Sequence, residues 1–259
     1  MGYETLITVL EEGILTITLN RPSRMNALNQ TALDEIHHIL DEAEKSEEVK
    51  CVVVIGSEKA FSVGADITEV NKVNSSFSGY ANSKKYQNCF ARFEKLAKPV
   101  VAAVRGHALG GGCELMMACD FRIAAEDARI GLPEVGIGAM PAGGGTVKLP
   151  LLINPLKAKE MLCLGRPVSG KDAAELGLVN IAVPAEQVLA EAYSLAEELA
   201  QKPPLVLKTI KQVTNLATKE IESLLEHEAQ GFAMLAATED YKEGMGAFLE
   251  KRKPVFRGK

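Results

Sequence analysis

Hydrophobic positions in the first quarter of the chain change from a strand-like to a helix-like period. Two segments rich in β-branched residues, 4–10 and 13–20, are joined by the turn Glu11-Glu12-Gly13, which predicts a β-hairpin. Residues 32–45 then repeat apolar side chains at helical spacing, and the apolar run 51–57 follows them. We therefore expect a hairpin, a helix and a short buried strand, in this order.

Similar segments recur in the middle of the chain. Residues 98–106 and 120–132 have the pattern of inner strands, and each leads into a glycine-rich segment. Repeated units of strand, turn and helix are typical of an α/β fold with parallel strands. Residues 69–92 differ, because Ser, Asn and Gly cluster there with weak periodicity. They predict a mobile loop or a loosely held helix.

Strand patterns nearly stop in the last part of the chain. Amphipathic helices are expected over 186–201, 204–217 and 219–237. This change in pattern predicts an α/β core over residues 1–195 and a helical region over residues 196–259. We expect the helical region to pack on the core or on a neighbouring subunit.

Composition narrows the classes of partner. The formal net charge of −5 argues against a nucleic-acid partner. No apolar run approaches the roughly 20 residues of a membrane span, and acidic residues precede any long apolar run at the N-terminus, so we expect neither a membrane partner nor a secretory signal. The five cysteines form no CxxC pair, which indicates reduced thiols and a cytoplasmic protein. The four histidines lack metal-ligand spacing, and we predict no metal site.

Residues 165–172, GRPVSGKD, come close to the pattern of a phosphate-binding loop. Asp172, however, stands where that loop needs a hydroxyl for magnesium, and its charge would repel phosphates. The preceding residues also have a helical pattern where a strand is needed. We instead expect one helix to end at Gly165 and the next to be capped by Ser169.

The stretch 106–120, GHALGGGCELMMACD, contains one carboxylate among apolar residues. A helix that begins at Gly111 or Gly112 would leave its first N–H groups without internal partners, although the glycines alone are also compatible with a tight turn. Glu114 would be costly to bury unless it is paired, protonated or faces a cavity. One interpretation is a salt bridge to Arg105 or Arg122, and the other is an acid or base in a pocket.

Two further segments favour the second interpretation. Glu134 is a second carboxylate alone among apolar residues and glycines, and two such acids in one apolar region suit general acid/base chemistry. The segment 61–67, FSVGADI, follows a core strand with a Gly-Ala turn. The N–H of Ala65 could lie opposite that of Gly111, and two convergent N–H groups form an oxyanion hole.

Five motifs follow one another along the chain: LNRPSRMNAL (19–28), FSVGADI (61–67), GHALGGGCEL (106–115), GLPEVGIGAMPAGGGT (131–146) and GKDAAELGLVN (170–180). In their order and approximate spacing they resemble the crotonase superfamily, the enoyl-CoA hydratases and isomerases, over essentially the full chain. The resemblance implies an α/β fold built as a spiral of repeated β-β-α units, with C-terminal helices that serve trimerisation. It also implies a homotrimer or a homohexamer made as a dimer of trimers.

The resemblance also implies a reaction. The oxyanion hole of Ala65 and Gly111 would bind the thioester carbonyl of an acyl-CoA, and no cofactor is implied because coenzyme A is part of the substrate. In a hydratase, Glu114 would activate water for addition at C3 of a trans-2-enoyl-CoA, and Glu134 would deliver the proton to C2. Positioned groups of this kind contribute about 10² to 10⁴ in rate. The alternatives are a double-bond isomerase, another crotonase-type acyl-CoA lyase and an acyl-CoA binding protein without chemistry.

Contacts to the substrate carry over only in part. A basic residue at Arg24 is expected near the phosphates, and the backbone around residues 62–65 is expected to receive the adenine amine, with Lys251 or Lys259 as further basic candidates. Ala142 replaces a glycine whose N–H is expected to help position the water, and alanine keeps that N–H. The expected binding residues are Arg24, Ser62, Val63, Gly64, Asp66, Ile67 and Lys259.

Overall fold

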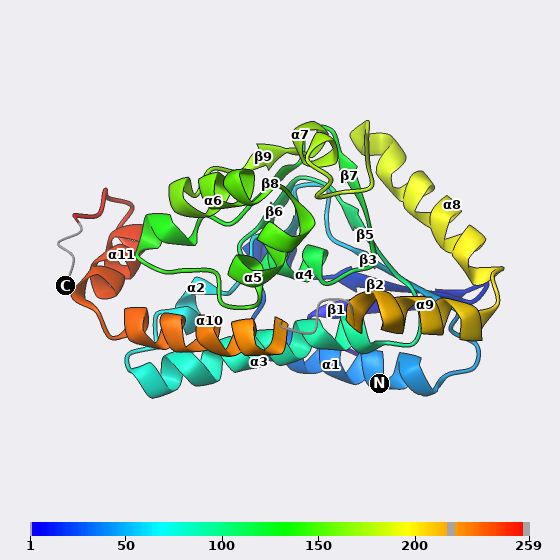
Figure 1. Ribbon diagram of the computed structural model, residues 1–259, viewed down its shortest axis with the longest axis horizontal. Coiled ribbons are helices and arrows are strands. Elements are labelled where there is room, and N and C mark those ends of the chain that lie inside the picture. Colours follow the sequence, from blue (N-terminus) through cyan, green and yellow to red (C-terminus); the bar gives the residue numbers. More distant parts are fainter. Residues whose placement is uncertain (1, 217–220, 256–259) are drawn as a thin grey trace.

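The computed structural model describes residues 2–216 and 221–255 of the chain (Figure 1). The strands are β1 (Leu6–Glu11), β2 (Ile14–Leu19), β3 (Cys51–Ile55), β4 (Ala60–Ser62), β5 (Val100–Val104), β6 (His107–Leu109), β7 (Phe121–Ala125), β8 (Arg129–Gly131), β9 (Val168–Ser169) and β10 (Ile181–Val183). The α-helices are α1 (Gln30–Lys45), α2 (Ile67–Val70), α3 (Ser76–Lys95), α4 (Gly111–Met117), α5 (Gly145–Leu152), α6 (Pro155–Leu164), α7 (Gly170–Glu175), α8 (Val188–Ala200), α9 (Pro204–Leu216), α10 (Ile221–Ala236) and α11 (Glu239–Leu249). Short 3₁₀ helices are η1 (Pro22–Arg24), η2 (Glu134–Ile137) and η3 (Ala185–Gln187).

The larger sheet has six strands in the order β1-β2-β3-β5-β7-β10. The expected hairpin β1–β2 is antiparallel, and the remaining neighbours are parallel. Its turn uses Glu12 and Gly13 with φ of 50° and 83°, the left-handed region that tight hairpin turns require. Strand β5 is buried at every position, which explains its continuous apolar pattern.

The chain crosses repeatedly between this sheet and a smaller one of order β4-β6-β8-β9. Strands β3, β5 and β7 belong to the larger sheet, and each is followed directly by β4, β6 or β8 of the smaller sheet. This alternation is the expected β-β-α repeat. Because β4, β6 and β8 are parallel neighbours, the segments that follow them leave the sheet at the same edge. Residues 63–66, 110–114 and 132–134 are therefore brought together.

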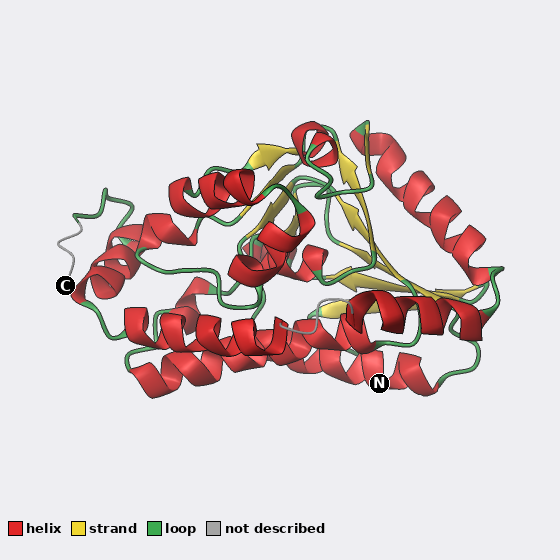
Figure 2. Ribbon diagram, in the orientation of Figure 1, coloured by secondary structure: helices red, strands yellow, loops and turns green. Residues whose placement is uncertain are grey.

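Helices pack on the strands from different sides. Helix α8 contacts β2, β3, β5 and β7, while α10 runs along α3, and α3 packs on α1. In Figure 2 the strands lie between α8 and the layer formed by α1, α3 and α10. The expected C-terminal helices thus pack on the core of their own chain. The expected division after residue 195 falls within α8, and it stays a prediction.

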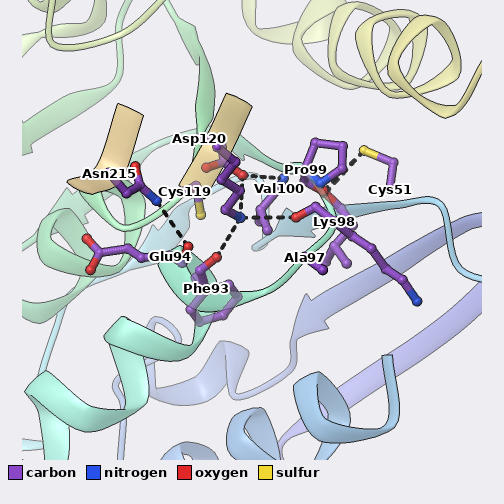
Figure 3. Close-up of polar contacts among 12 residues, drawn as sticks. Cys51, Phe93, Glu94, Ala97, Lys98, Pro99, Val100, Cys119, Asp120 and Asn215 are labelled. Carbon is purple, nitrogen blue, oxygen red and sulfur yellow. Dashed lines mark hydrogen bonds and ion pairs between the residues drawn. The ribbon is translucent and has the colours of Figure 1, made fainter. Parts of the chain in front are cut away.

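Helix α9 is attached to the core by an ion pair between Lys211, which is buried, and Asp120, which is partly buried. Lys211 Nζ lies 2.7 Å from Asp120 Oδ2 and also donates to the carbonyls of Phe93 and Lys98. Asp120 Oδ2 accepts in turn from the N–H of Val100 at 2.8 Å, and both of these residues are labelled in Figure 3. Removal of either charge would leave the other without its partner and with little access to water, which destabilises the fold.

Of the two alternatives expected for residues 69–92, the mobile loop is wrong for most of the segment, and the helix is present but is packed on α1 and α10. Residues 76–95 form α3, a helix of 20 residues that starts with a capping box between Ser75 and Ser78. Its buried side includes Ser83 and Gln87 beside aromatic residues. Polar residues on the buried side weaken the hydrophobic periodicity, which is why the pattern concealed the helix.

The region that resembled a phosphate loop has the alternative structure we expected. Helix α6 ends at Gly165 with φ of 61°, and Ser169 caps α7. The side chain of Asp172 completes this cap by accepting from the N–H of Ser169. None of the described helices is long and apolar enough to cross a lipid bilayer.

Candidate active site

A pocket of about 670 Å³ opens at the edge of the smaller sheet where β4, β6 and β8 end. Most of its wall is apolar, and it is closed on one side by α10 and α11 through Phe232 and Phe248. Three acidic residues, Asp66, Glu114 and Glu134, are among the residues that line it. The lining residues that the sequence had pointed to are Arg24, Val63, Ala65, Asp66, Ile67, Gly111, Glu114, Glu134 and Ala142.

Two backbone amides in this wall are candidates for an oxyanion hole. The N–H of Leu28 donates to the carbonyl of Gly64, and the carbonyl of Leu28 accepts from the N–H of Asp66. The N–H of Ala65, which lies between these two groups in the chain, therefore points to the opposite side, toward α4. A Cβ on Gly111 would lie 3.3 Å from the Ala65 nitrogen, which places the two residues against each other. Within the described residues, neither N–H donates to a protein acceptor.

Glycine is required at residue 64 for this arrangement. Its φ is 92°, and a Cβ there would lie only 2.7 Å from the nitrogen of Gly111. A side chain at this position would therefore both strain the turn and cover an amide of the pocket.

Glu114 lies on the first turn of α4 with 3% of its surface exposed. Its Oε1 accepts from the N–H groups of Gly143 and Gly145, each at 2.8 Å. Burial and the charges of two nearby carboxylates, Glu228 and Glu134, raise the pKa of Glu114 well above its ordinary value, while the two amide bonds act to lower it.

The alternative of a salt bridge from Glu114 to Arg105 or Arg122 is wrong. Arg105 lies 3.9 Å from Glu58 instead, and Arg122 donates to the carbonyls of Met117 and Cys119. The helix does begin at Gly111, as one of the two expected starts.

Glu134 enters the pocket at the start of η2. Its Oε2 is buried and has no hydrogen-bond partner among the described residues. Burial is the main reason that its pKa rises, to about 7, with a further contribution from the charge of Glu228. A Cβ on Gly110 would lie 3.0 Å from Glu134 Oε1, so a glycine leaves room for this carboxyl.

Sequence analysis missed a third buried acid, Glu228 on α10. Its carboxylate accepts from the N–H of Gly144 at 2.7 Å, from the N–H of Thr146 at 3.0 Å and from the Thr146 hydroxyl. A signal was available, because Glu228 lies three residues after Leu225 and four before Phe232, on the apolar stripe of its helix. A carboxylate on the buried stripe of a helix needs hydrogen-bond donors to replace water.

Other expected binding residues lie at or behind the pocket wall. Asp66 lines it, but its carboxylate is bound to Arg21 and Thr68. Ser62 is fully buried, and its hydroxyl donates to the carbonyl of Asn26. Neither Ser62 nor Gly64 lines the pocket. Lys259 lies outside the described residues.

In the part of the chain that the structure describes, no group of three or more His, Cys, Asp or Glu side chains could hold a metal ion. The buried thiols of Cys89 and Cys113 have pKa values raised by burial, and these side chains pack in the core.

Comparison with known proteins decides the family. The family described as enoyl-CoA hydratase/isomerase matches residues 10–259. The chain belongs to this family. Among individual members, a crotonyl-CoA hydratase of Syntrophomonas wolfei is 40% identical over 261 residues and covers 100% of both chains. A short-chain-enoyl-CoA hydratase of Clostridium acetobutylicum is 38% identical, over 98% of this chain and 97% of its own.

Solved structures of the family agree with the fold. An enoyl-CoA hydratase/isomerase from Xanthobacter autotrophicus Py2 superposes with a TM-score of 0.89 at 34% identity, covering 99% of this chain and 100% of its own. The expected crotonase-type architecture is thereby confirmed.

Proposed function

We propose that this protein is an enoyl-CoA hydratase, which adds water reversibly in syn geometry to a trans-2-enoyl-CoA to give a 3-hydroxyacyl-CoA. The observation that carries the proposal is the presence of Glu114 and Glu134 in one pocket, beside the amides of Ala65 and Gly111. Relatives named crotonyl-CoA hydratase and short-chain-enoyl-CoA hydratase support it. Hydration needs one group to activate water and one to supply a proton, and the pocket contains two carboxyl groups for these roles, Glu114 and Glu134.

The amides of Ala65 and Gly111 stabilise the negative charge that develops on the thioester oxygen. When water adds at C3, the electrons of the double bond move toward the carbonyl and produce an enolate-like transition state. Two fixed N–H groups aimed at this oxygen cost no reorganisation during the reaction, and one such donor is typically worth about 2.7–4 kcal/mol.

Glu114 acts as the base and Glu134 as the acid. N–H groups from Gly143 and Gly145 can bind only the acceptor oxygen of Glu114, and they favour its ionised form. The ionised Glu114 takes a proton from water, and the oxygen of that water bonds to C3. Glu134, whose Oε2 has no donor among the described residues, keeps its proton more readily and transfers it to C2.

The substrate binds with its acyl chain toward the apolar part of the pocket. Ile137, Met140 and Phe232 line this part, while Arg24 lies at the end of η1, where it is exposed and can meet the phosphates of coenzyme A. The backbone of residues 62–65 receives the adenine amine, and the amide of Ala142 helps to hold the water. Coenzyme A enters as part of the substrate, and the reaction uses no further cofactor.

The working form is a homotrimer or a homohexamer in the cytoplasm. Helix α9 supports this assembly because it exposes four apolar side chains, with exposed fractions from 52% to 76%: Leu205, Val206, Ile210 and Val213. A second copy of the chain is the occupant that would cover them.

The test is an assay of hydration with crotonyl-CoA and longer enoyl-CoAs, in which the loss of the enoyl-thioester absorbance measures the rate. In water labelled with ¹⁸O and deuterium, a hydratase places one ¹⁸O at C3 and one deuterium at C2. Conversion of a 3-enoyl-CoA to its 2-enoyl isomer without uptake of oxygen would replace the proposal with an isomerase. Binding of CoA esters without turnover of any would replace it with a binding protein.

A further inference from the structure

We propose that Glu228 is a positioning residue of the reaction: from α10 it fixes the backbone of residues 142–146, and this backbone holds the carboxylate of Glu114. The inference deepens the proposed function and rests on it. Glu228 does not line the pocket, so it acts through the loop.

Successive amides of this loop point in alternate directions. The N–H groups of Gly143 and Gly145 bind Glu114 Oε1, each at 2.8 Å. The N–H groups of Gly144 and Thr146 bind Glu228, at 2.7 and 3.0 Å. The loop is therefore held between two carboxylates, and a displacement on one side moves the donors on the other.

The glycines of the loop allow this double contact. A Cβ on Gly143 would lie 2.7 Å from Glu114 Oε2, and one on Gly145 would lie 2.9 Å from Glu114 Oε1. Gly144 has φ of 118°, a conformation that other residues rarely adopt. A loop with so little side-chain packing of its own depends on its hydrogen bonds for a single conformation.

Helix α3 completes the support. Gln87 Nε2 and Ser83 Oγ donate to the carbonyl of Ala142, at 3.2 and 2.7 Å. Gln87 Nε2 also lies 3.3 Å from Glu228 Oε2. The Glu228 carboxylate thus meets donors from α3 and from the start of α5, while its own helix packs along α3.

Glu228 also sets the charge around Glu114. The ionisable groups around this cluster include Glu114 and Cys113 on α4, Glu134 on η2, Tyr86 on α3 and Lys148 on α5. Lys148 is already paired with Glu94 of α3 at 2.6 Å, so loss of the charge at residue 228 should affect mainly the pKa values of Glu114 and Glu134.

The primary test is Glu228→Gln, with Glu226→Gln as the matched control. Glu226 is on the same helix and binds Tyr80 and Lys84 of α3, away from the loop. The side-chain amide introduced by Glu228→Gln would set an N–H group against one of the loop amides, so we expect kcat to fall about 10- to 100-fold with little change in KM. Removing a neighbouring negative charge should also move the acid limb of the kcat/KM profile to lower pH. Glu226→Gln should change neither.

Two more variants distinguish the positioning effect of Glu228 from the effect of its charge and from a loss of folding. Glu228→Asp keeps the charge but shortens the side chain, so kcat should fall while the acid limb stays in place. Thr146→Val removes one hydroxyl donor and should lower kcat by about threefold or more, a loss that corresponds to at least ~0.6 kcal/mol. Thr146→Val decides the matter if Glu228→Gln fails to fold.

The outcomes distinguish this inference from the proposed function. If the wild type hydrates no enoyl-CoA, the proposed function fails. If the wild type hydrates and Glu228→Gln keeps the wild-type kcat and pH profile, or loses only thermal stability, Glu228 has no positioning role. An unchanged kcat in Thr146→Val would also overturn the positioning role of Glu228.

Discussion

The two acids of the pocket have opposite kinds of surroundings. Glu114 extends from an α-helix, and its Oε1 accepts two backbone N–H groups. Glu134 stands at the start of a 3₁₀ turn, and its Oε2 is buried with no donor among the described residues. Both carboxyls are largely removed from water, but Glu114 accepts from two amides of another segment, whereas a single backbone hydrogen bond acts to lower the pKa of Glu134.

This difference underlies the roles that we propose for two residues of identical chemistry. Burial raises the pKa of Glu114, Glu134 and Glu228, and the charges of neighbouring carboxylates raise the pKa of Glu114 and Glu134 further. Donors around Glu114 and Glu228 favour their ionised forms, so a proton shared by the three carboxyls is best held by Glu134. In the proposed reaction, a base and an acid can thus coexist in one pocket at one pH.

The largest effect should come from Glu114→Gln. The amide oxygen can still accept from Gly143 and Gly145, so the loop keeps its position while the base is lost. We expect kcat/KM for crotonyl-CoA hydration to fall by about 10³- to 10⁴-fold, measured against an exposed control, Glu58→Gln. A loss below about tenfold would remove Glu114 from the chemistry.

Glu134→Gln should have the next largest effect. The amide cannot transfer a proton to C2, and we expect kcat to fall by about 10²- to 10³-fold. Incorporation of deuterium at C2 measures the same step directly. If the variant still exchanged the C2 proton at the wild-type rate, the acid would be another group.

Glu134→Gln should lower kcat but raise the free energy of unfolding at neutral and higher pH. The pKa of Glu134 is raised to about 7 in the folded chain, against an ordinary value of 4.5. Between these two pH values the Glu134 carboxyl ionises more readily in the unfolded chain than in the folded chain, so the free energy of unfolding of the wild type falls as pH rises. Above about pH 7 the variant should be more stable by up to about 3 kcal/mol, and the two proteins should converge below pH 4.5. Denaturant unfolding at about pH 4 and about pH 8 checks this, and equal differences at both would contradict it.

The smallest effect should come from Ala142→Gly, which restores the residue usual at this position in the resembled family. Ala142 already supplies its N–H without a left-handed φ. We expect kcat/KM to change by less than about threefold and the free energy of unfolding to drop by about 0.4–1 kcal/mol, since glycine gains freedom in the unfolded chain. A tenfold gain in activity would mean that the methyl group obstructs the water.

Much of the fold could be predicted, because its signals are local. The hairpin of residues 6–19, the buried strand β5 and the cap at Ser169 each follow from a short pattern. Glu114 and Glu134 stood out for the same reason, as single acids in apolar surroundings. Helix α3 was expected only as one of two alternatives, because its buried side carries Ser83 and Gln87, which bind the loop at 142–146.

Long-range partners could not be found in this way. Glu228 lies 82 positions from the Thr146 amide that it binds, and its helix also contains Glu226, which binds Lys84 away from the loop. Ser62 and Gly64 belong to a motif of the site, but their contribution is to shape the backbone behind Ala65. A motif marks where a site lies, and the packing decides which atoms reach the pocket.

The contact between Thr146 and Glu228 also has a consequence for synthesis. At about 5–20 residues per second, the ribosome needs about 4–16 s to extend the chain over the 82 positions that separate these residues. During that interval both pocket acids already exist, but the loop that aligns Glu114 lacks its second carboxylate. The nascent chain should therefore acquire its activity late, when α10 has emerged and settled along α3.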